Sequence, residues 1–337
     1  MRKLAILPAL CLAFCAAPSF AQTLEADPAP AHAEAPAAEQ ILVVGQKPGP
    51  GMWKVSKGEH VLWVFGTYAP LPKNMEWRSH QVEAVIARSQ EYLAPPGAKA
   101  SPGFFKTLTL LPSLIGVRKN PDGAQLRDLM PPEQYTRWTE LKTKYLPGNE
   151  DAERERPIFA AEALVRVARK QAGLDSDDAV RKRIQELVKK NKLKTTSAIV
   201  DLPMDNAGAM LKKFKKTQLN DVACLSKTMA TLETEIAEAS ARANAWARGR
   251  LDEMRKLDFV EREQACFSSV FDSAVFDNEP AFKNMRALMR QKWLAAAENA
   301  LATNTSTFAL MPIKDILDPN GVLSALAAKG YRVEEPD

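Results

Sequence analysis

One apolar run that ends in Gly-Thr constrains the fold of this chain more than any other feature. Residues 60–65 have the character of a buried strand, and Gly66, Thr67 and a loop bracketed by prolines follow directly. Two further apolar segments, 92–94 and 307–311, also run into a proline. In open α/β sheets the ligand crevice lies just beyond the carboxyl ends of the strands. We therefore expect a site where these three segments end.

Segments with strand character gather at the two ends of the chain. Met52–Val55 and residues 60–65, separated by a tight turn, predict a hairpin. A helix over 77–90 leads into the strand at 92–94, which predicts a βαβ unit that is right-handed if its strands are parallel. A strand over 330–333 closes the chain. We expect an α/β fold, with a mixed sheet built from N- and C-terminal strands and capped by a largely helical middle region.

Helical periodicity fills the middle of the chain, with one β-branched stretch at 195–202 that indicates a strand. The longest predicted helix, over 217–248, carries a continuous apolar seam and ends at Gly249. That seam allows two interpretations, packing within its own domain or a coiled-coil homodimer. The other predicted helices begin at Pro131 and extend over 158–172, 176–187, 258–266, 280–301 and 319–328.

The N-terminus indicates export. A charged start, an apolar run over 4–14 and small residues up to Ala21 predict a secretory signal peptide over 1–21, cleaved after Ala21. We expect the protein in the periplasm. Residues 22–40 are rich in Ala, Pro and Glu and predict a disordered linker, followed by a single domain over 41–337. Loss of Arg2 and Lys3 lowers the net charge from +5 to +3, which does not favour a nucleic-acid partner.

The cysteine count predicts one disulfide. Two of the four cysteines leave with the signal peptide, so Cys224 and Cys266 remain in an oxidising compartment. The alternative is a pair of buried free thiols. A disulfide closing this loop should stabilise the fold by about 4 kcal/mol.

Familiar catalytic patterns are missing from the sequence. Beyond the signal peptide the histidines are His32, His60 and His80, and no two of them have metal-ligand spacing. There is no Gly-x-Ser-x-Gly motif, and we expect no cofactor. A lysine cluster is either a solvated helix face or a contact for anionic lipid headgroups or an acidic partner. Its members are Lys212, Lys213, Lys215 and Lys216.

The two ends of the chain resemble the TraB/GumN family, which includes the Tiki proteases. Met52–Ser56 followed by Val64–Thr67 is similar to the opening hairpin of that family. Thr307–Ala309, Gly321–Leu323 and Gly330–Val333 are similar to its closing segment. The resemblance implies that active members are metal-dependent proteases or hydrolases. Their site would hold two Gly-x-x-His motifs and a Glu at a strand end.

Carried over by position, this implied site has lost its ligands. Ala69 and Lys314 stand where the two histidines would be, and Pro95 stands at the position of the Glu. Ala and Pro offer no donor, and a protonated Lys repels a cation. The first motif keeps its glycine, Gly66, whereas Met311 replaces the glycine of the second motif. The resemblance therefore implies a degenerate site at Gly66, Thr67, Ala69, Pro95, Met311 and Lys314.

Three functional hypotheses follow. The first is an exported protein without catalytic activity that binds a peptide, an envelope component or a partner protein through the former cleft, where Lys314 would favour an anionic group. The second is a metal-dependent protease or hydrolase that recruits Asp201, Asp205, Asp315 or Asp318, or ligands from a partner chain. The third is an assembly factor that dimerises through Leu232 and Ile236.

Overall fold

The computed structural model describes residues 49–100, 110–175, 179–256 and 260–336, all within one compact unit that starts at Gln46. The expected signal peptide and linker lie outside the described residues, as do the first residues of the helices predicted over 176–187 and 258–266. None of the helices in the described ranges combines the length and apolar character needed to cross a bilayer.

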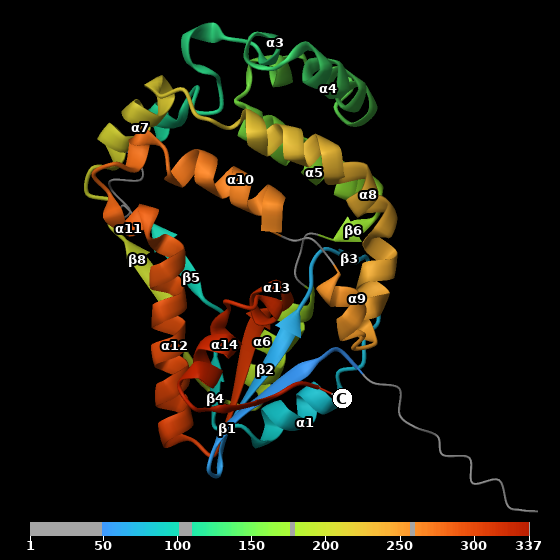
Figure 1. The fold of residues 1–337 in the computed structure, drawn as a ribbon, viewed down its shortest axis with the longest axis vertical. Helices are drawn as coiled ribbons and strands as arrows, with labels where there is room; N and C mark the ends of the chain where they lie inside the picture. Colours follow the sequence, from blue (N-terminus) through green and yellow to red (C-terminus); the bar gives the residue numbers. More distant parts are fainter. Residues whose placement is uncertain (1–48, 101–109, 176–178, 257–259, 337) are drawn as a thin grey trace, which may run out of the picture. The chain divides into compact units, whose positions relative to one another are not determined.

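A six-stranded mixed sheet joins the two ends of the chain, as predicted (Figure 1). The strand order is β10-β1-β2-β9-β4-β7. β1 pairs antiparallel with both β2 and β10, and the remaining pairs are parallel. The strands are β1 (Met52–Lys57), β2 (His60–Thr67), β4 (Glu91–Leu93), β7 (Lys194–Thr196), β9 (Ser306–Pro312) and β10 (Arg332–Glu334).

The predicted βαβ unit is present in part. β2 and β4, connected through α1 (His80–Arg88), both run parallel to β9. They are not neighbours, however, because β9 lies between them. Residues 307–311 of β9 are all buried, which fits a central parallel strand covered on both faces. The position of β9, a strand from the far end of the chain, cannot be predicted from local sequence patterns.

The remaining strands form two small sheets. The stretch over 195–202 was predicted as one strand, but it divides into β7 and a separate strand β8. β3 pairs with β6, and β5 pairs with β8. Their bounds are β3 (Leu71–Pro72), β5 (Gly97–Ala100), β6 (Leu174–Asp175) and β8 (Ile199–Leu202).

Helices make up most of the middle region, as predicted. The helices that follow α1 include α3 (Leu126–Leu129), α4 (Pro132–Tyr145), α5 (Pro157–Gln171), α6 (Ala179–Lys190), α7 (Ala207–Lys216), α8 (Val222–Ala247), α9 (Leu251–Arg255), α10 (Val260–Phe271), α11 (Pro280–Lys283), α12 (Met285–Thr303) and, after β9, α13 (Ile313–Leu317) and α14 (Val322–Ala328). Short 3₁₀ turns occur at η1 (Pro121–Gly123), η2 (Glu150–Arg154) and η3 (Ala274–Phe276).

The helix predicted over 217–248 begins later, at Val222, for an identifiable reason. The buried guanidinium of Arg156 donates to the carbonyl oxygens of Phe214, Lys215 and Thr217. These contacts satisfy the end of α7 and stop the chain from continuing as one helix. The helix predicted over 280–301 likewise divides, at Asn284, and that predicted over 319–328 starts only at Val322.

The apolar seam of α8 is used within the chain. Leu225, Met229 and Leu232 belong to one buried cluster with α4 and α5, while Ala243 and Trp246 belong to the cluster around the main sheet. α8 therefore connects two parts of the core. These buried residues are not available for a coiled-coil partner, because exposing them would disrupt the core of the fold.

Candidate functional site

The carboxyl ends of β2 and β9 lie side by side. In their parallel register Gly66 lies opposite Met311 and Thr67 lies opposite Pro312. The Thr67 hydroxyl donates to the carbonyl oxygen of Met311 over 3.3 Å. The two segments singled out in the sequence therefore start from adjacent points on one sheet edge.

Close packing explains the glycine at position 66. The indole Nε1 of Trp246 donates to the Gly66 carbonyl oxygen over 2.8 Å. A Cβ atom added at Gly66 would lie 3.0 Å from the ring of Trp53 and 3.2 Å from Ile313. Gly66 thus lets the Trp53 ring and α13 approach the end of β2, which is a structural role.

Beyond β2 the chain borders a small polar cavity of about 70 Å³. Tyr68 and Ala69 form part of its wall, and residues of α5, α8 and α10 form much of the rest. We call it the polar cavity; it is lined by Tyr68, Ala69, Pro70, Arg169, Leu174, Leu232, Glu235, Ile236, Ala239, Arg242, Arg262 and Glu263.

Charged side chains dominate the electrostatics of the polar cavity. Arg262 of α10 forms an ion pair with Glu235 of α8 at 3.0 Å. Burial raises the pKa of the Tyr68 hydroxyl, and the charges of Arg242 and Arg169 oppose this shift. Burial, followed by the charge of Arg262, lowers the pKa of Arg169. Among the described residues, Arg169 forms no ion pair or hydrogen bond, so its charge is only partly compensated.

Lys314 reaches the same cavity through an ion pair. It lies on α13, which begins directly after β9, and its Nζ atom pairs with Glu263 of the cavity wall. The neighbouring Asp315 has a raised pKa, because burial and the charges of Glu263 and Asp318 outweigh the effect of Lys314. Ala69 therefore lines the polar cavity, whereas Lys314 contacts the cavity wall only through its ion pair with Glu263.

The third implied position lies elsewhere on this edge. Pro95 follows the end of β4 by two residues, and it is not among the residues that line the polar cavity. Leu93 of β4 lies opposite Ala309 of β9, so the strand does end near the same edge. Of the three implied positions, Ala69 lines the polar cavity, Lys314 contacts its wall through Glu263, and Pro95 does neither.

Clusters suited to a metal ion are missing from the described residues. No three His, Cys, Asp or Glu side chains in those ranges come together as ligands. Asp201 forms an exposed ion pair with Lys99 at 3.0 Å, and Asp318 accepts the backbone N–H of Asn320. The donor set near Lys314 therefore does not fit a divalent cation well.

A second, larger cavity adjoins the polar one and shares Arg169, Leu174 and Arg262 with it. Its volume is about 630 Å³. Five cationic side chains and a single carboxylate lie on an otherwise largely apolar wall. We call it the basic cleft; it is lined by Lys73, Ile158, Ala161, Glu162, Val165, Arg166, Arg169, Lys170, Leu174, Cys224, Thr228, Arg262 and Cys266.

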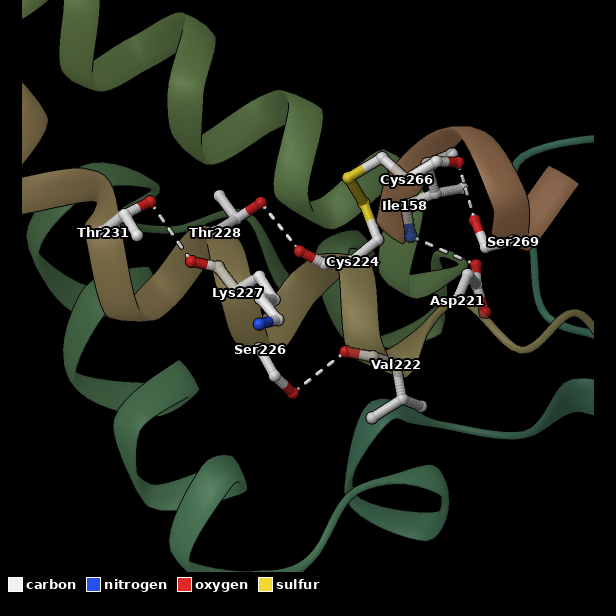
Figure 2. Close-up of a disulfide and its surroundings, with 10 residues drawn as sticks. All are labelled: Ile158, Asp221, Val222, Cys224, Ser226, Lys227, Thr228, Thr231, Cys266 and Ser269. Carbon is white, nitrogen blue, oxygen red and sulfur yellow. Dashed lines mark hydrogen bonds between the residues drawn. A yellow bond between two sulfur atoms is a disulfide. The ribbon is translucent and has the colours of Figure 1, made fainter. Parts of the chain in front are cut away.

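A disulfide forms part of the basic cleft and confirms the predicted pairing (Figure 2). Cys224 of α8 and Cys266 of α10 are joined, with Cα atoms 4.5 Å apart. Beside it, the Asp221 carboxylate accepts the backbone N–H of Ile158 over 3.1 Å. The cross-link attaches α10, and with it Arg262 and Glu263, to the more deeply buried α8.

The sequence did not predict the charged residues that α8 and α10 contribute to the polar cavity. Glu235 and Arg242 are seven residues apart on α8, so they share one face beside the apolar seam. Charged residues on the border of a buried seam are a usable signal that a polar site lies there. Arg262 and Glu263 gave no comparable signal, since their role depends on how α10 folds back onto α8.

Comparison with known proteins gives one result at the family level. The model of the TraB/PrgY/gumN family matches residues 51–335. Neither a curated protein nor a solved structure matches the chain.

Proposed function

Since the chain belongs to the TraB/PrgY/gumN family, we propose that it is an exported member without catalytic activity. Its function is to bind a peptide, an envelope component or a partner protein. The ligand enters the basic cleft and presents an anionic group to Arg169, close to the polar cavity where the family resemblance places a metal site.

One observation carries this proposal. At the polar cavity Ala69 supplies no donor, and Lys314 supplies a cation that Glu263 already neutralises. A divalent metal would need several converging donors that are free to bind it. The surroundings of these two positions therefore favour binding over metal chemistry.

The charge of the basic cleft supports an anionic ligand. Its wall carries five cations and one carboxylate, Glu162, and of the five cations Arg262 is already paired with Glu235. A guanidinium forms two parallel hydrogen bonds with a carboxylate, so Arg166 and Arg169 suit an acidic side chain or a chain terminus. The apolar wall would contact the rest of the ligand, as in small-molecule and peptide sites generally.

The first test measures metal content and peptide binding. We expect much less than one equivalent of Mn, Co or Zn after incubation and desalting. A fluorescent peptide of alternating Glu and Leu should bind more tightly than its Lys-Leu counterpart. Arg166→Gln with Lys170→Gln, both exposed, should weaken it about tenfold or more, because each charge-assisted contact contributes about 1.5–3 kcal/mol.

Lys189→Gln with Lys190→Gln is the matched control, since both lysines are exposed on α6 and neither lines a cavity. Stoichiometric metal, or equal binding of the acidic and basic peptides, would contradict the proposal.

The second candidate, a metal-dependent hydrolase, has one observation in its favour. Asp315 is a partly buried carboxyl with a raised pKa, close to the charges of Glu263 and Asp318. Perturbed carboxyls of this kind occur at catalytic sites. Peptide hydrolysis that depends on added metal and is lost in Asp315→Asn would establish this candidate and exclude the first.

Export is a separate part of the proposal and rests on the sequence of residues 1–21. Expression in a bacterium with a periplasm should release the protein with Gln22 as its first residue. Edman sequencing or intact mass of the osmotic-shock fraction checks this, and an uncleaved cytoplasmic product would contradict it.

A further inference from the structure

The described surface exposes few large apolar side chains, and most of them lie together. Four such residues are exposed, and three fall within five positions of the chain: Leu111, Leu114 and Ile115, at 51%, 46% and 76% exposure. Residues 110–114 are helical, so Leu111 and Leu114 lie on one face with Ile115 directly after them. The fourth, Ile199, lies on β8.

This apolar turn is attached to α7 by two contacts. The Nζ atom of Lys215 donates to the carbonyl oxygen of Ile115 over 3.0 Å. A Cβ atom placed on Gly208 of α7 would lie 3.7 Å from Leu110, so the start of the turn packs on that helix. The exposed aliphatic side chains therefore border α7 directly.

The sequence of α7 separates its apolar and cationic residues. Met210 and Phe214 pack against a buried cluster that includes Leu219, Val275 and Phe276. Lys212, Lys213 and Lys216 are exposed, and Lys215 is partly so. The hydrogen-bonded ion pair with Lys283, at 2.8 Å, is the main cause of the lowered pKa of Asp277, and the charge of Lys213 contributes less. The lysines of α7 thus keep most of their charge for an external partner.

We propose that the apolar turn and α7 together form a docking face for an anionic lipid surface. Lysines beside exposed Leu and Ile are the combination that holds peripheral proteins at a bilayer. The cations attract the headgroups, and the aliphatic side chains enter the boundary between headgroups and acyl chains. Neither feature alone would specify a membrane.

A second copy of this chain and an acidic protein are the competing occupants of this face. A contact between copies would use the aliphatic residues and place two lysine-rich helices near each other, which is unfavourable at low salt. An acidic protein would account for the lysines but leaves the exposed aliphatic side chains unexplained. A bilayer accounts for both features.

The test is sedimentation of the processed chain, from Gln22, with vesicles of phosphatidylcholine alone or with about 30% phosphatidylglycerol. We expect binding only to the anionic vesicles, weakened by salt. Lys212→Glu with Lys213→Glu should reduce it by roughly 30-fold or more, since each lysine near such a surface contributes about 1 kcal/mol. Leu111→Ser with Ile115→Ser should also reduce it, and the remaining binding should be more sensitive to salt.

Matched changes elsewhere serve as controls. Lys189→Glu with Lys190→Glu alters the same charge on α6, and Ile199→Ser removes the fourth exposed apolar side chain. Both should leave vesicle binding within about twofold of the original. The proposal is overturned if the original chain does not bind anionic vesicles, if it binds neutral ones equally, or if the controls lose as much as the α7 and apolar-turn variants.

Discussion

Removal of the disulfide should have two separable effects, one on global stability and one on α10. Cys224 and Cys266 are 42 positions apart in sequence. In the chain-entropy account, releasing a loop of that length lowers the free energy of unfolding by about 4 kcal/mol. The double variant Cys224→Ala with Cys266→Ala should show this loss in guanidinium denaturation at neutral pH.

The local effect follows from how little of α10 is buried. Within residues 262–271, Ser269 is the one buried residue. Ion pairs attach the helix through Arg262 to Glu235 and through Glu263 to Lys314. Partly exposed ion pairs typically contribute up to about 1 kcal/mol each. Phe271 also packs against the ring of Phe276, but the disulfide is the strongest single attachment of α10.

Hydrogen exchange separates the two effects. In the double variant, amides of α10 should lose protection at denaturant concentrations where α4, which carries the buried Trp138, is still protected. The double variant should also bind the acidic peptide more weakly, because Arg262 of α10 lines the basic cleft. A stability loss below about 1 kcal/mol, or uniform loss of protection in α4 and α10, would refute this reasoning.

Three further substitutions test single contacts. Gly66→Ala should destabilise the fold by about 1–3 kcal/mol through overpacking. In the control Gly97→Ala the new Cβ would meet nothing nearer than 3.6 Å, so the loss of stability should be less than about 0.5 kcal/mol. Equal thermal shifts of the two variants would contradict this. Burial raises the pKa of Asp221, so its contribution to stability is present at low pH and is lost as pH rises through its folded pKa. Asp221→Asn keeps an acceptor for the Ile158 N–H and should flatten that decline without lowering stability at neutral pH; a large loss in denaturation curves would oppose it. Burial opposes ionisation of Glu91, but hydrogen bonds to the carboxylate outweigh it and lower its pKa, so this stabilisation is lost as pH falls through the folded pKa. Glu91→Gln should cost about 1–3 kcal/mol at neutral pH and show a shallower acid limb, and an unchanged acid limb would count against this assignment.

Local patterns predicted the elements of the fold and much of their arrangement. The hairpin, the closing strand and the long amphipathic helix all follow from alternation and helical periodicity. The insertion of β9 between β2 and β4 could not be predicted this way, because strand order depends on pairing between residues more than 200 positions apart, as in Glu91 with Thr307. The start of α8 at Val222 instead of 217 depends on Arg156, which no local rule connects to that segment.

Local sequence patterns likewise indicated one part of the candidate site and could not indicate the other. Ala69 and Lys314 follow strands, so their sequence context indicated the sheet edge. The basic cleft is built from α5, α8 and α10, whose residues come together only after the helices pack. The cysteine count did predict the Cys224–Cys266 link, since a pairing constraint applies at any distance in sequence.

The packing also changes which cation should receive a ligand. The sequence favoured Lys314, but Glu263 already compensates its charge, so an anion there would have to displace an existing carboxylate. Arg169 is better placed, because burial lowers its pKa and it borders both cavities. A bound carboxylate would restore the stabilisation that burial removes from the guanidinium.

Two variants distinguish these assignments with the acidic peptide probe. Arg169→Gln should weaken binding by about tenfold or more, because a charge-assisted contact contributes about 1.5–3 kcal/mol. Lys314→Gln leaves Glu263 without its ion pair beside the polar cavity, so it should weaken binding less, through repulsion at longer range, and increasingly so at low salt. If Lys314→Gln abolishes binding while Arg169→Gln preserves it, the ligand binds directly at Lys314 and does not occupy the basic cleft.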